Sequence, residues 1–331
     1  MWEESQPEFA FTSLTRSRGD TIIPAMSEDN GLRGPEKNSG VTGPTIGKPL
    51  VAIVTDSATA LPESAVRKHC LHVARMEITI GGQTYEDGPE NSLLDFYRRL
   101  RTLDRLPTTS APKPDAWLAA FRSAAAEAKS VFCVTLSANL SAAYDAARVA
   151  AEMTVTELPD VEIRVFDSRT AAGSQALIVL DAARLAATGA DIASVSDRAL
   201  VTAERVRLLA YLDTLEYIHR GGRVPRVAVW ATNLFNIKPV MEFSSGRVGS
   251  IARPRSRRRA FNRMLSEVLR DLDGNRGHVN VMHADAEDEA NDLMRQIGDR
   301  VRCDELFITQ FHPFMGAHTG PGLVGVSYWG E

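Results

Sequence analysis

The chain has 331 residues, which suffices for one large or two medium domains. Its 44% hydrophobic and 24% charged residues are typical of a globular protein, and its formal net charge of −4 argues against attraction of the whole surface to nucleic acid. The three cysteines have no metal-ligand spacing, and no apolar run approaches the roughly 20 residues that span a bilayer, so we expect a cytoplasmic protein.

Residues 1–48 differ in composition from the remainder of the chain. They are rich in turn-forming residues of mixed charge and carry no sustained hydrophobic periodicity. Such a segment buries too little apolar surface to offset the entropy that ordering costs. We therefore expect a disordered N-terminal extension without a chemical role.

Residues 49–200 are expected to form a first α/β lobe. Apolar runs at residues 50–54, 131–136 and 161–166 are each followed by a polar loop and then by a helical pattern. This repetition predicts a parallel, Rossmann-like sheet whose loops gather at the carboxyl ends of the strands, where ligands bind. The polar side chains of these loops are Asp56, Ser57, Ser137, Asn139, Asp167 and Ser168. Bracing of the loops and N-capping of a helix by Ser137 are the structural alternatives.

Two other segments of this lobe have recognisable patterns. Residues 72–80 predict one strand, and Gly81 with Gly82 predicts a hairpin turn after it. Residues 107–114 hold three prolines around Thr109 and Ser110, which excludes a helix and indicates an extended loop open to solvent or to a ligand.

Residues 201–331 are expected to form a second α/β lobe. Tight turns join several of its apolar runs, which predicts hairpins and therefore a mixed sheet. The expected strands are residues 207–212, 238–243, 247–251, 277–282, 305–311 and 324–328.

A glycine-rich stretch near the end of this lobe is the first candidate for a site. Residues 316–322 contain three glycines and Pro321, a composition that argues against a helix or a regular strand. We expect a fixed loop, supported at Gly320, that presents His318 and Thr319. A simple turn with an incidental histidine is the alternative.

A basic cluster runs from Arg253 to Arg263, with six arginines and no acid in eleven residues. A solvated helix face, a contact for an acidic partner and a contact for an anionic membrane surface are all compatible with it, each cation contributing about 1 kcal/mol near such a membrane. The overall charge disfavours nucleic acid as the partner.

Eight short motifs occur along the chain: Thr55-Asp56-Ser57, Thr109-Ser110-Ala111-Pro112, Ser137 with Leu140-Ser141, Asp167-Ser168 with Gly173, Gly221-Gly222-Arg223, Asn236-Ile237-Lys238-Pro239, His283-Ala284-Asp285-Ala286 and His318-Thr319-Gly320-Pro321-Gly322. In these motifs and in their order the chain resembles the DegV family of fatty-acid-binding proteins, from Val51 to Val326.

This resemblance implies a two-lobe DegV-like fold with a long-chain fatty acid in a tunnel between the lobes. It also implies a role as the lipid-binding subunit of a bacterial fatty acid kinase in phospholipid metabolism, where a separate ATP-binding partner converts the bound carboxylate to an acyl phosphate. The residues that it assigns to the carboxylate are Thr109, Ser110, Ser137, His318 and Thr319, and it assigns Arg223 to phosphate transfer and to the partner. Ala138 stands where the family has a hydroxyl, so we expect Asn139 to replace that contact, and Lys113 also departs from the pattern.

Two other classes of protein remain as alternatives. A serine-type lipid hydrolase would use Ser137, His318 and either Asp56 or Asp167, although no Gly-x-Ser-x-Gly elbow surrounds Ser137. A lipid sensor or scaffold would bind the ligand without a kinase partner. The chain has no phosphate-binding loop motif. Neither the spacing of His312 and His318 nor that of His283 and Asp285 favours a metal site, so we expect a non-catalytic protein without a cofactor or a metal.

Overall fold

The structure is a computed structural model that describes residues 49–331 except 89–92, 223–236 and 245. The expected N-terminal extension and Arg223 therefore lie outside the described residues. The described part belongs to one compact unit, Lys48–Glu331, which contains three sheets.

The first sheet is parallel, in the strand order β2-β1-β6-β7. Its register pairs Val54 of β1 with Cys133 of β6. Every residue of β1 and β6 is buried, as expected of strands that helices cover on both faces. The strands are β1 (Val51–Asp56), β2 (His72–Ala74), β6 (Ser130–Thr135) and β7 (Glu162–Asp167).

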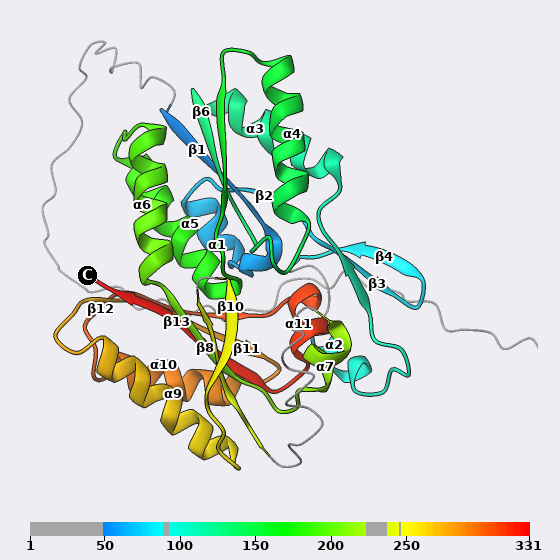
Figure 1. Cartoon of the computed structure of the whole chain (residues 1–331), viewed down its shortest axis with the longest axis vertical. Coiled ribbons are helices and arrows are strands. Elements are labelled where there is room, and N and C mark those ends of the chain that lie inside the picture. The colour runs from blue at the N-terminus through cyan, green and yellow to red at the C-terminus, as the bar shows by residue number, and fades with distance from the viewer. Residues whose placement is uncertain (1–48, 89–92, 223–236, 245) are drawn as a thin grey trace, which may run out of the picture. The chain divides into compact units, whose positions relative to one another are not determined.

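Helices lie on both faces of this sheet (Figure 1). One face carries α3 (Pro114–Glu127) and α4 (Ala143–Glu157), and the other carries α5 (Ala172–Ala187) and α6 (Ile192–Arg205). A 3-10 turn, Ser57–Thr59, and α1 (Glu63–Lys68) follow β1, and α2 (Leu93–Leu100) lies in the connection between β4 and β5. The three loops after β1, β6 and β7 consequently meet at one edge, as the sequence predicts.

The second sheet has six strands in the order β10-β9-β8-β13-β11-β12 and is mixed, because only β11 and β12 run parallel. Helices α9 (Arg257–Asp271) and α10 (Glu287–Gly298) cover one of its faces (Figure 1). Its strands are β8 (Arg207–Tyr211), β9 (Val240–Ser244), β10 (Arg247–Ala252), β11 (Gly277–Ala284), β12 (Cys303–Gln310) and β13 (Leu323–Gly330). The short helix α7 (Glu216–Gly221) follows β8.

Helix α5 lies between the two large sheets. It packs against β1 on one side and against β11 and β13 on the other, and nearly all of its residues are buried. A hydrogen bond of 3.1 Å joins Ser174 of α5 to Ser327 of β13. A helix that is apolar all round is stable only where both faces are covered, so α5 couples the two sheets.

A third sheet, in the order β4-β3-β5, corrects two predictions. The expected single strand over residues 72–80 is wrong, since β2 ends at Ala74 and β3 (Glu77–Ile80) belongs to this other sheet. The expected hairpin is present, with β3 and β4 (Gln83–Glu86) antiparallel. The proline-flanked segment is extended, as predicted, but it forms the edge strand β5 (Thr108–Ser110), because its straight backbone can pair with β3.

The expected loop at residues 316–322 is also wrong in part, because its first half belongs to the helix α11 (Pro313–Thr319). Proline is tolerated at the first helical position, where no N–H is needed, and a single internal glycine costs only about 1 kcal/mol. The helix ends at Gly320, whose φ of 69° and ψ of 170° are accessible only to glycine. His318 therefore lies in the last turn of a helix.

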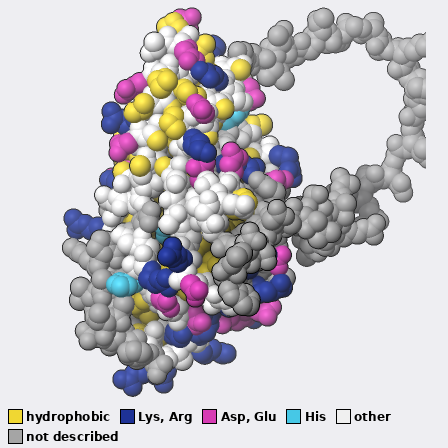
Figure 2. Space-filling view, turned by 90° about the vertical axis from the view of Figure 1, so that its right-hand side faces the viewer, with side chains coloured by type: hydrophobic (Ala, Val, Ile, Leu, Met, Phe, Trp, Pro, Cys, Tyr) yellow, Lys and Arg dark blue, Asp and Glu magenta, His cyan; other side chains and the backbone are white. Residues whose placement is uncertain are grey.

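The surface carries interspersed charges. On the face shown in Figure 2, basic and acidic side chains alternate, so no stripe of a single sign crosses the coloured part of that face. No helix in the described part of the chain is both long and apolar enough to cross a bilayer.

Candidate functional site

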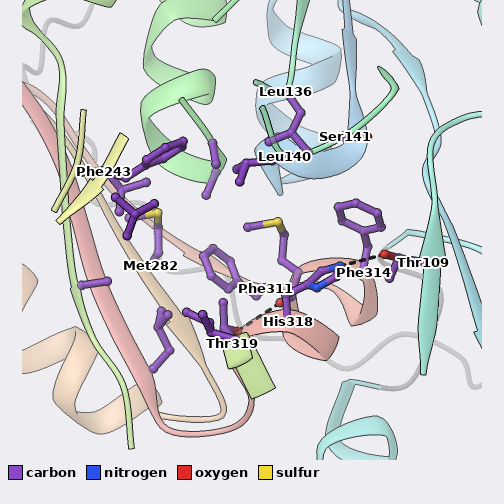
Figure 3. Close-up of a pocket in the computed structure, with 18 of the residues that line it drawn as sticks. Thr109, Leu136, Leu140, Ser141, Phe243, Met282, Phe311, Phe314, His318 and Thr319 are labelled. Carbon is purple, nitrogen blue, oxygen red and sulfur yellow. Dashed lines mark hydrogen bonds between the residues drawn. The ribbon is translucent and has the colours of Figure 1, made fainter. Parts of the chain in front are cut away.

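A cavity of about 380 Å³ lies where the loops after β6 and β7 meet strands β8 to β10 and helix α11 (Figure 3). Most of its lining is apolar. The apolar residues are Ala111, Leu136, Leu140, Ala142, Ala171, Ala172, Leu208, Ala210, Leu212, Ile218, Met241, Phe243, Val248, Met282, Phe311, Phe314, Met315 and Leu323. Loops that follow strands of the parallel sheet and strands of the mixed sheet both contribute to this lining, so the cavity depends on the way that α5 holds the two sheets together.

The polar lining residues are Thr109, Ser110, Ser141, His318 and Thr319. The central contact is between Thr109 Oγ1 and His318 Nε2, which are 2.7 Å apart although the residues are 209 positions apart in the chain. Which atom donates depends on the imidazole tautomer. In Figure 3 this pair lies at one side of the cavity, and Phe243 and Met282 lie at the opposite side. The cavity is therefore amphipathic.

Helix α11 fixes the position of the imidazole. The ring of His318 packs edge-on against Phe314 at 5.7 Å between centroids. Gly221 lets the end of α7 approach the ring, since a Cβ atom at that position would lie only 3.0 Å from Nδ1 of His318. Two long-range hydrogen bonds hold the start of the helix. Asp87 Oδ1 accepts from the N–H of Phe314 at 2.9 Å, and Tyr97 Oη donates to the carbonyl of Phe311 at 2.8 Å.

Asp87 also connects this helix to the first sheet, because its Oδ2 accepts from the hydroxyl of Ser57 at 3.0 Å. The same hydroxyl accepts from the N–H of Met76 at 3.0 Å. Ser57, predicted as a supporting residue, thus acts through Asp87 rather than by facing the cavity. Sequence reasoning missed Asp87, because no local pattern indicates that a fully buried carboxylate serves a helix over 200 residues away.

Asp56 braces the loop after β6. It is fully buried and accepts hydrogen bonds from the N–H groups of Leu136 at 2.7 Å and Ala58 at 3.1 Å, and from the amide of Gln175 at 3.0 Å. Burial raises the pKa of Asp56 to about 6, although these hydrogen bonds favour the ionised form. Because the pKa is higher in the folded chain, the contribution of Asp56 to stability is complete below about pH 4 and is lost as pH rises through about 6.

The loop after β7 is braced in a similar way. Asp167 Oδ1 accepts from the N–H groups of Ala138 at 3.2 Å and Arg169 at 2.9 Å. The hydroxyl of Ser168 donates to the carbonyl of Thr170 at 3.2 Å. These contacts hold two of the loops together.

Two predicted carboxylate ligands, Ser137 and Asn139, are not among the residues that line the cavity. The hydroxyl of Ser137 is buried and accepts from the N–H of Asn139 at 3.3 Å, and the N-cap of α4 is Ala142 rather than Ser137. The amide of Asn139 donates to the carbonyl of Gly246 at 3.3 Å. It thus joins the loop after β6 to the turn between β9 and β10.

Ser141 lines the cavity instead, although the site predicted from the sequence did not include it. Its Oγ accepts from the N–H of Ala143 at 3.2 Å, which leaves the hydroxyl hydrogen able to point into the cavity. The repeated serines in this loop were the available signal, but the sequence does not say which of them faces inward. Thr319 also lines the cavity, and its hydroxyl donates to the carbonyl of Met315 at 3.1 Å.

The residues of the hydrolase alternative do not converge on one point. Nε2 of His318 faces Thr109, Ser137 lies outside the cavity lining, and both acids brace backbone amides. His283 Nδ1 accepts from the N–H of Ala286, and Asp285 pairs with Arg101 at 2.6 Å. These contacts explain the motif around His283 as local structure.

Comparison with known proteins identifies the family. The model of the DegV family, described as uncharacterised proteins, matches residues 50–331. A DegV domain-containing protein of Streptomyces coelicolor is 33% identical over 83% of this chain and 97% of its own length. Among solved structures, a DegV family protein from Thermus thermophilus, described for its fatty acid binding, is 25% identical with a TM-score of 0.78 over 85% of this chain and 100% of that one.

A stearic acid-binding protein from Eubacterium ventriosum has the same identity and TM-score, and the match covers 85% of this chain and 98% of that protein. These matches confirm both the resemblance and the expected α/β fold with one parallel and one mixed sheet. The chain belongs to the DegV family.

Proposed function

We propose that this protein binds a long-chain fatty acid in the cavity between its two large sheets. The observation that carries the proposal is the amphipathic lining, with the Thr109–His318 pair at one side and an apolar wall at the other. Cavities of about 300–1,000 Å³ with few polar groups are typical ligand sites, and this one lies within that range. The fatty acid binding described for the Thermus thermophilus and Eubacterium ventriosum proteins supports the proposal.

The carboxylate would lie beside Thr109, Ser110, Ser141 and His318. An ionised carboxylate costs several kcal/mol or more to bury without partners, so several donors must converge on it. Hydroxyls and an imidazole are such donors, and the described cavity lining has no other group of them. Thr319 contributes mainly by closing the end of α11, because its hydroxyl already donates within the helix. The acyl chain would extend toward Phe243 and Met282.

The bound carboxylate would be presented to a separate ATP-dependent kinase for conversion to an acyl phosphate. The chain itself has no phosphate-binding loop motif, which supports a division of labour between two proteins. Arg223, assigned to the phosphate and the partner, follows directly after Gly222 at the end of α7, and α7 approaches His318. A sensor or scaffold would bind the same ligand but would show no acyl phosphate formation with any ATP-binding partner.

Cargo exchange at an acidic surface is the second part of the proposal. Arg255, Arg258 and Arg259 are exposed near the start of α9 and would contact an anionic membrane or an acidic partner. Arg257, which the basic cluster also includes, is not available for this role, because it pairs with Glu289 at 2.8 Å and Asp213 at 3.3 Å. Binding to phosphatidylglycerol vesicles that is lost in the triple Arg→Glu variant would support it.

Intact-mass measurement of the native protein, followed by denaturing extraction, tests the function. We expect one fatty acid per chain, with a mass difference that disappears on denaturation. Removal of the lipid and titration with stearate should restore it. An empty cavity in every preparation, with no stearate uptake, would contradict the proposal. Acyl phosphate formed only when ATP and a kinase subunit are added would distinguish the kinase role from the sensor.

A further inference from the structure

A second cluster of polar side chains lies at the edge of the mixed sheet that is distant from the cavity. It contains His278 at the start of β11, Asp304 at the start of β12 and Glu331 after the end of β13. The topology brings them together, because β11 and β12 run parallel and β13 runs antiparallel to β11. The C label in Figure 1 marks this edge. None of the three lines the cavity.

Their ligand atoms lie close enough for one ion. Nε2 of His278 is 3.4 Å from Oε1 of Glu331 and 4.0 Å from Oδ2 of Asp304, and the three atoms lie within 4.8 Å of one another. In a tetrahedral zinc site with bonds of about 2.0–2.2 Å, neighbouring ligand atoms are about 3.3–3.6 Å apart. Of the three pairs, His278–Glu331 already has that separation and His278–Asp304 needs a contraction of about half an ångström. The two carboxylate oxygens lie within 4.8 Å of each other.

The imidazole of His278 is the observation that points to a ligand. Its residue is only 5% exposed, and in the described part of the chain its Nε2 has no hydrogen-bond partner. A buried polar atom is rarely left without a partner, because its desolvation is then uncompensated. Nε2 is directed at two carboxylates that solvent reaches, so an ion could enter between them.

The groups around the cluster resemble the outer shell of a metal site. Nδ1 of His278 lies 3.0 Å from Glu305, which Arg184 in turn holds at 2.7 Å. A carboxylate on Nδ1 fixes the tautomer that offers a lone pair at Nε2. The ring is stacked on Trp329 at 4.2 Å with an angle of 6°, so it cannot rotate easily away from this direction.

The charge of the cluster also suits a cation. Arg276 donates to Oδ1 of Asp304 at 2.8 Å, which leaves Oδ2 facing His278. Asp304, Glu305 and Glu331 carry three negative charges, and Arg184 and Arg276 carry two positive charges, so these five side chains have a formal charge of −1. We propose that His278, Asp304 and Glu331 bind a divalent transition-metal ion such as Zn²⁺ at the edge of the mixed sheet.

Calorimetric titration of the EDTA-treated full chain with ZnCl₂ tests this site, and absorption of the Co²⁺-loaded protein reports its geometry. We expect one ion per chain, bound at least tenfold more weakly by Glu331→Gln and by Asp304→Asn. Glu331 is exposed, so its substitution should not prevent folding. His219→Gln, which removes an exposed histidine elsewhere, is the matched control and should bind as the wild type does.

A second variant separates the metal site from a purely electrostatic cluster. Glu305→Gln weakens the outer contact to Nδ1 and should reduce Zn²⁺ affinity by about 10- to 100-fold. Two outcomes would show that the proposal is wrong. In the first, the wild type shows only weak Zn²⁺ binding, and His219→Gln removes it. In the second, Glu331→Gln and Asp304→Asn bind Zn²⁺ as tightly as the wild type does. The three residues would then form a polar cluster that holds no metal ion. Stearate uptake by each variant reports whether the variant has folded. None of the three cluster residues lines the cavity, so this readout does not depend on whether the metal binds.

Discussion

Replacing Thr109 by Val removes one hydroxyl from the polar side of the cavity and leaves the shape of the side chain almost unchanged. Thr109 lies on the edge strand β5, and its Oγ1 is 2.7 Å from Nε2 of His318. Valine also has a high strand propensity, so β5 should keep its pairing with β3. The substitution therefore tests the hydroxyl and not the strand.

The size of the effect follows from two opposing contributions. A hydrogen bond to a charged group stabilises by about 1.5–3 kcal/mol, and this is lost from the bound carboxylate. The ligand-free protein also loses the bond between Thr109 and His318, which contributes about 0.5–1.5 kcal/mol. The net loss of binding free energy is about 1–2 kcal/mol, so stearate should bind roughly 5- to 30-fold more weakly.

Competition against a fluorescent fatty acid, with delipidated protein, measures this difference. Stearate and octadecanol share the same apolar chain, but only stearate has a charged head group. Thr109→Val should weaken the binding of stearate roughly 5- to 30-fold and the binding of octadecanol by less than about threefold. A neutral hydroxyl loses less binding free energy than a carboxylate when one hydrogen bond is missing.

The matched control is Thr108→Val, since Thr108 is the exposed neighbour on the same strand and does not line the cavity. Thr109→Ser keeps the hydroxyl and should bind stearate within a small factor of the wild type. Equal stearate affinity of Thr109→Val and Thr108→Val would refute the proposed position of the carboxylate. An equal loss for both ligands would show that the variant changed the cavity and not the head-group contact.

Three other predictions concern stability and ligand length. Gly320→Ala should lower the free energy of unfolding more than Gly82→Ala does, as measured by urea titration. Both glycines have positive φ, but only at Gly320 would a Cβ atom meet a neighbour, the ring of Tyr217 at 2.1 Å. This clash should add about 1–3 kcal/mol to the loss of stability. Equal losses would contradict this packing. Asp56→Asn should remove the pH dependence that Asp56 contributes. The stability of the wild type relative to the variant should increase by about 2 kcal/mol from pH 7 to pH 4, because the pKa is raised by about two units and the remainder of the change falls below pH 4. A stability difference that stays constant or narrows would exclude the raised pKa. Val248→Trp on β10 should shrink the cavity and reduce the preference for stearate over the shorter myristate by roughly 15-fold. This factor assumes that about two methylenes lose their burial, at about 0.8 kcal/mol each. An unchanged ratio of the two affinities would place the acyl chain elsewhere.

Local sequence predicted most elements because their signals are local. The buried strands β1 and β6 are short β-branched runs, and the helix α4 that follows β6 has a periodic buried face, so their types needed no tertiary information. It failed where a neighbour decided the outcome. The pattern of residues 72–80 predicted one strand, but in the structure these residues belong to two different sheets. Helix α11 forms because its packing on α2 and α7 and the hydrogen bonds of Asp87 and Tyr97 outweigh the low helix propensity of its glycine.

The candidate site shows the same division. Motifs indicated Thr109 and His318 as site residues, and the structure places them in contact. No motif indicated that Ser141 rather than Ser137 would line the cavity, because the hydrogen bonds of the loop backbone, one of them to Thr170 of the neighbouring loop, decide which hydroxyl faces inward.

What the sequence alone determined is therefore the family, the alternation of strands and helices, and the edge of the parallel sheet at which the polar loops gather. The tertiary structure alone decided which side chains meet across long separations. Asp87 reaches α11, and His278, Asp304 and Glu331 converge from three strands. The physical reason is that propensity acts over a few neighbouring residues, whereas these contacts depend on strand register and on the burial of α5 between two sheets.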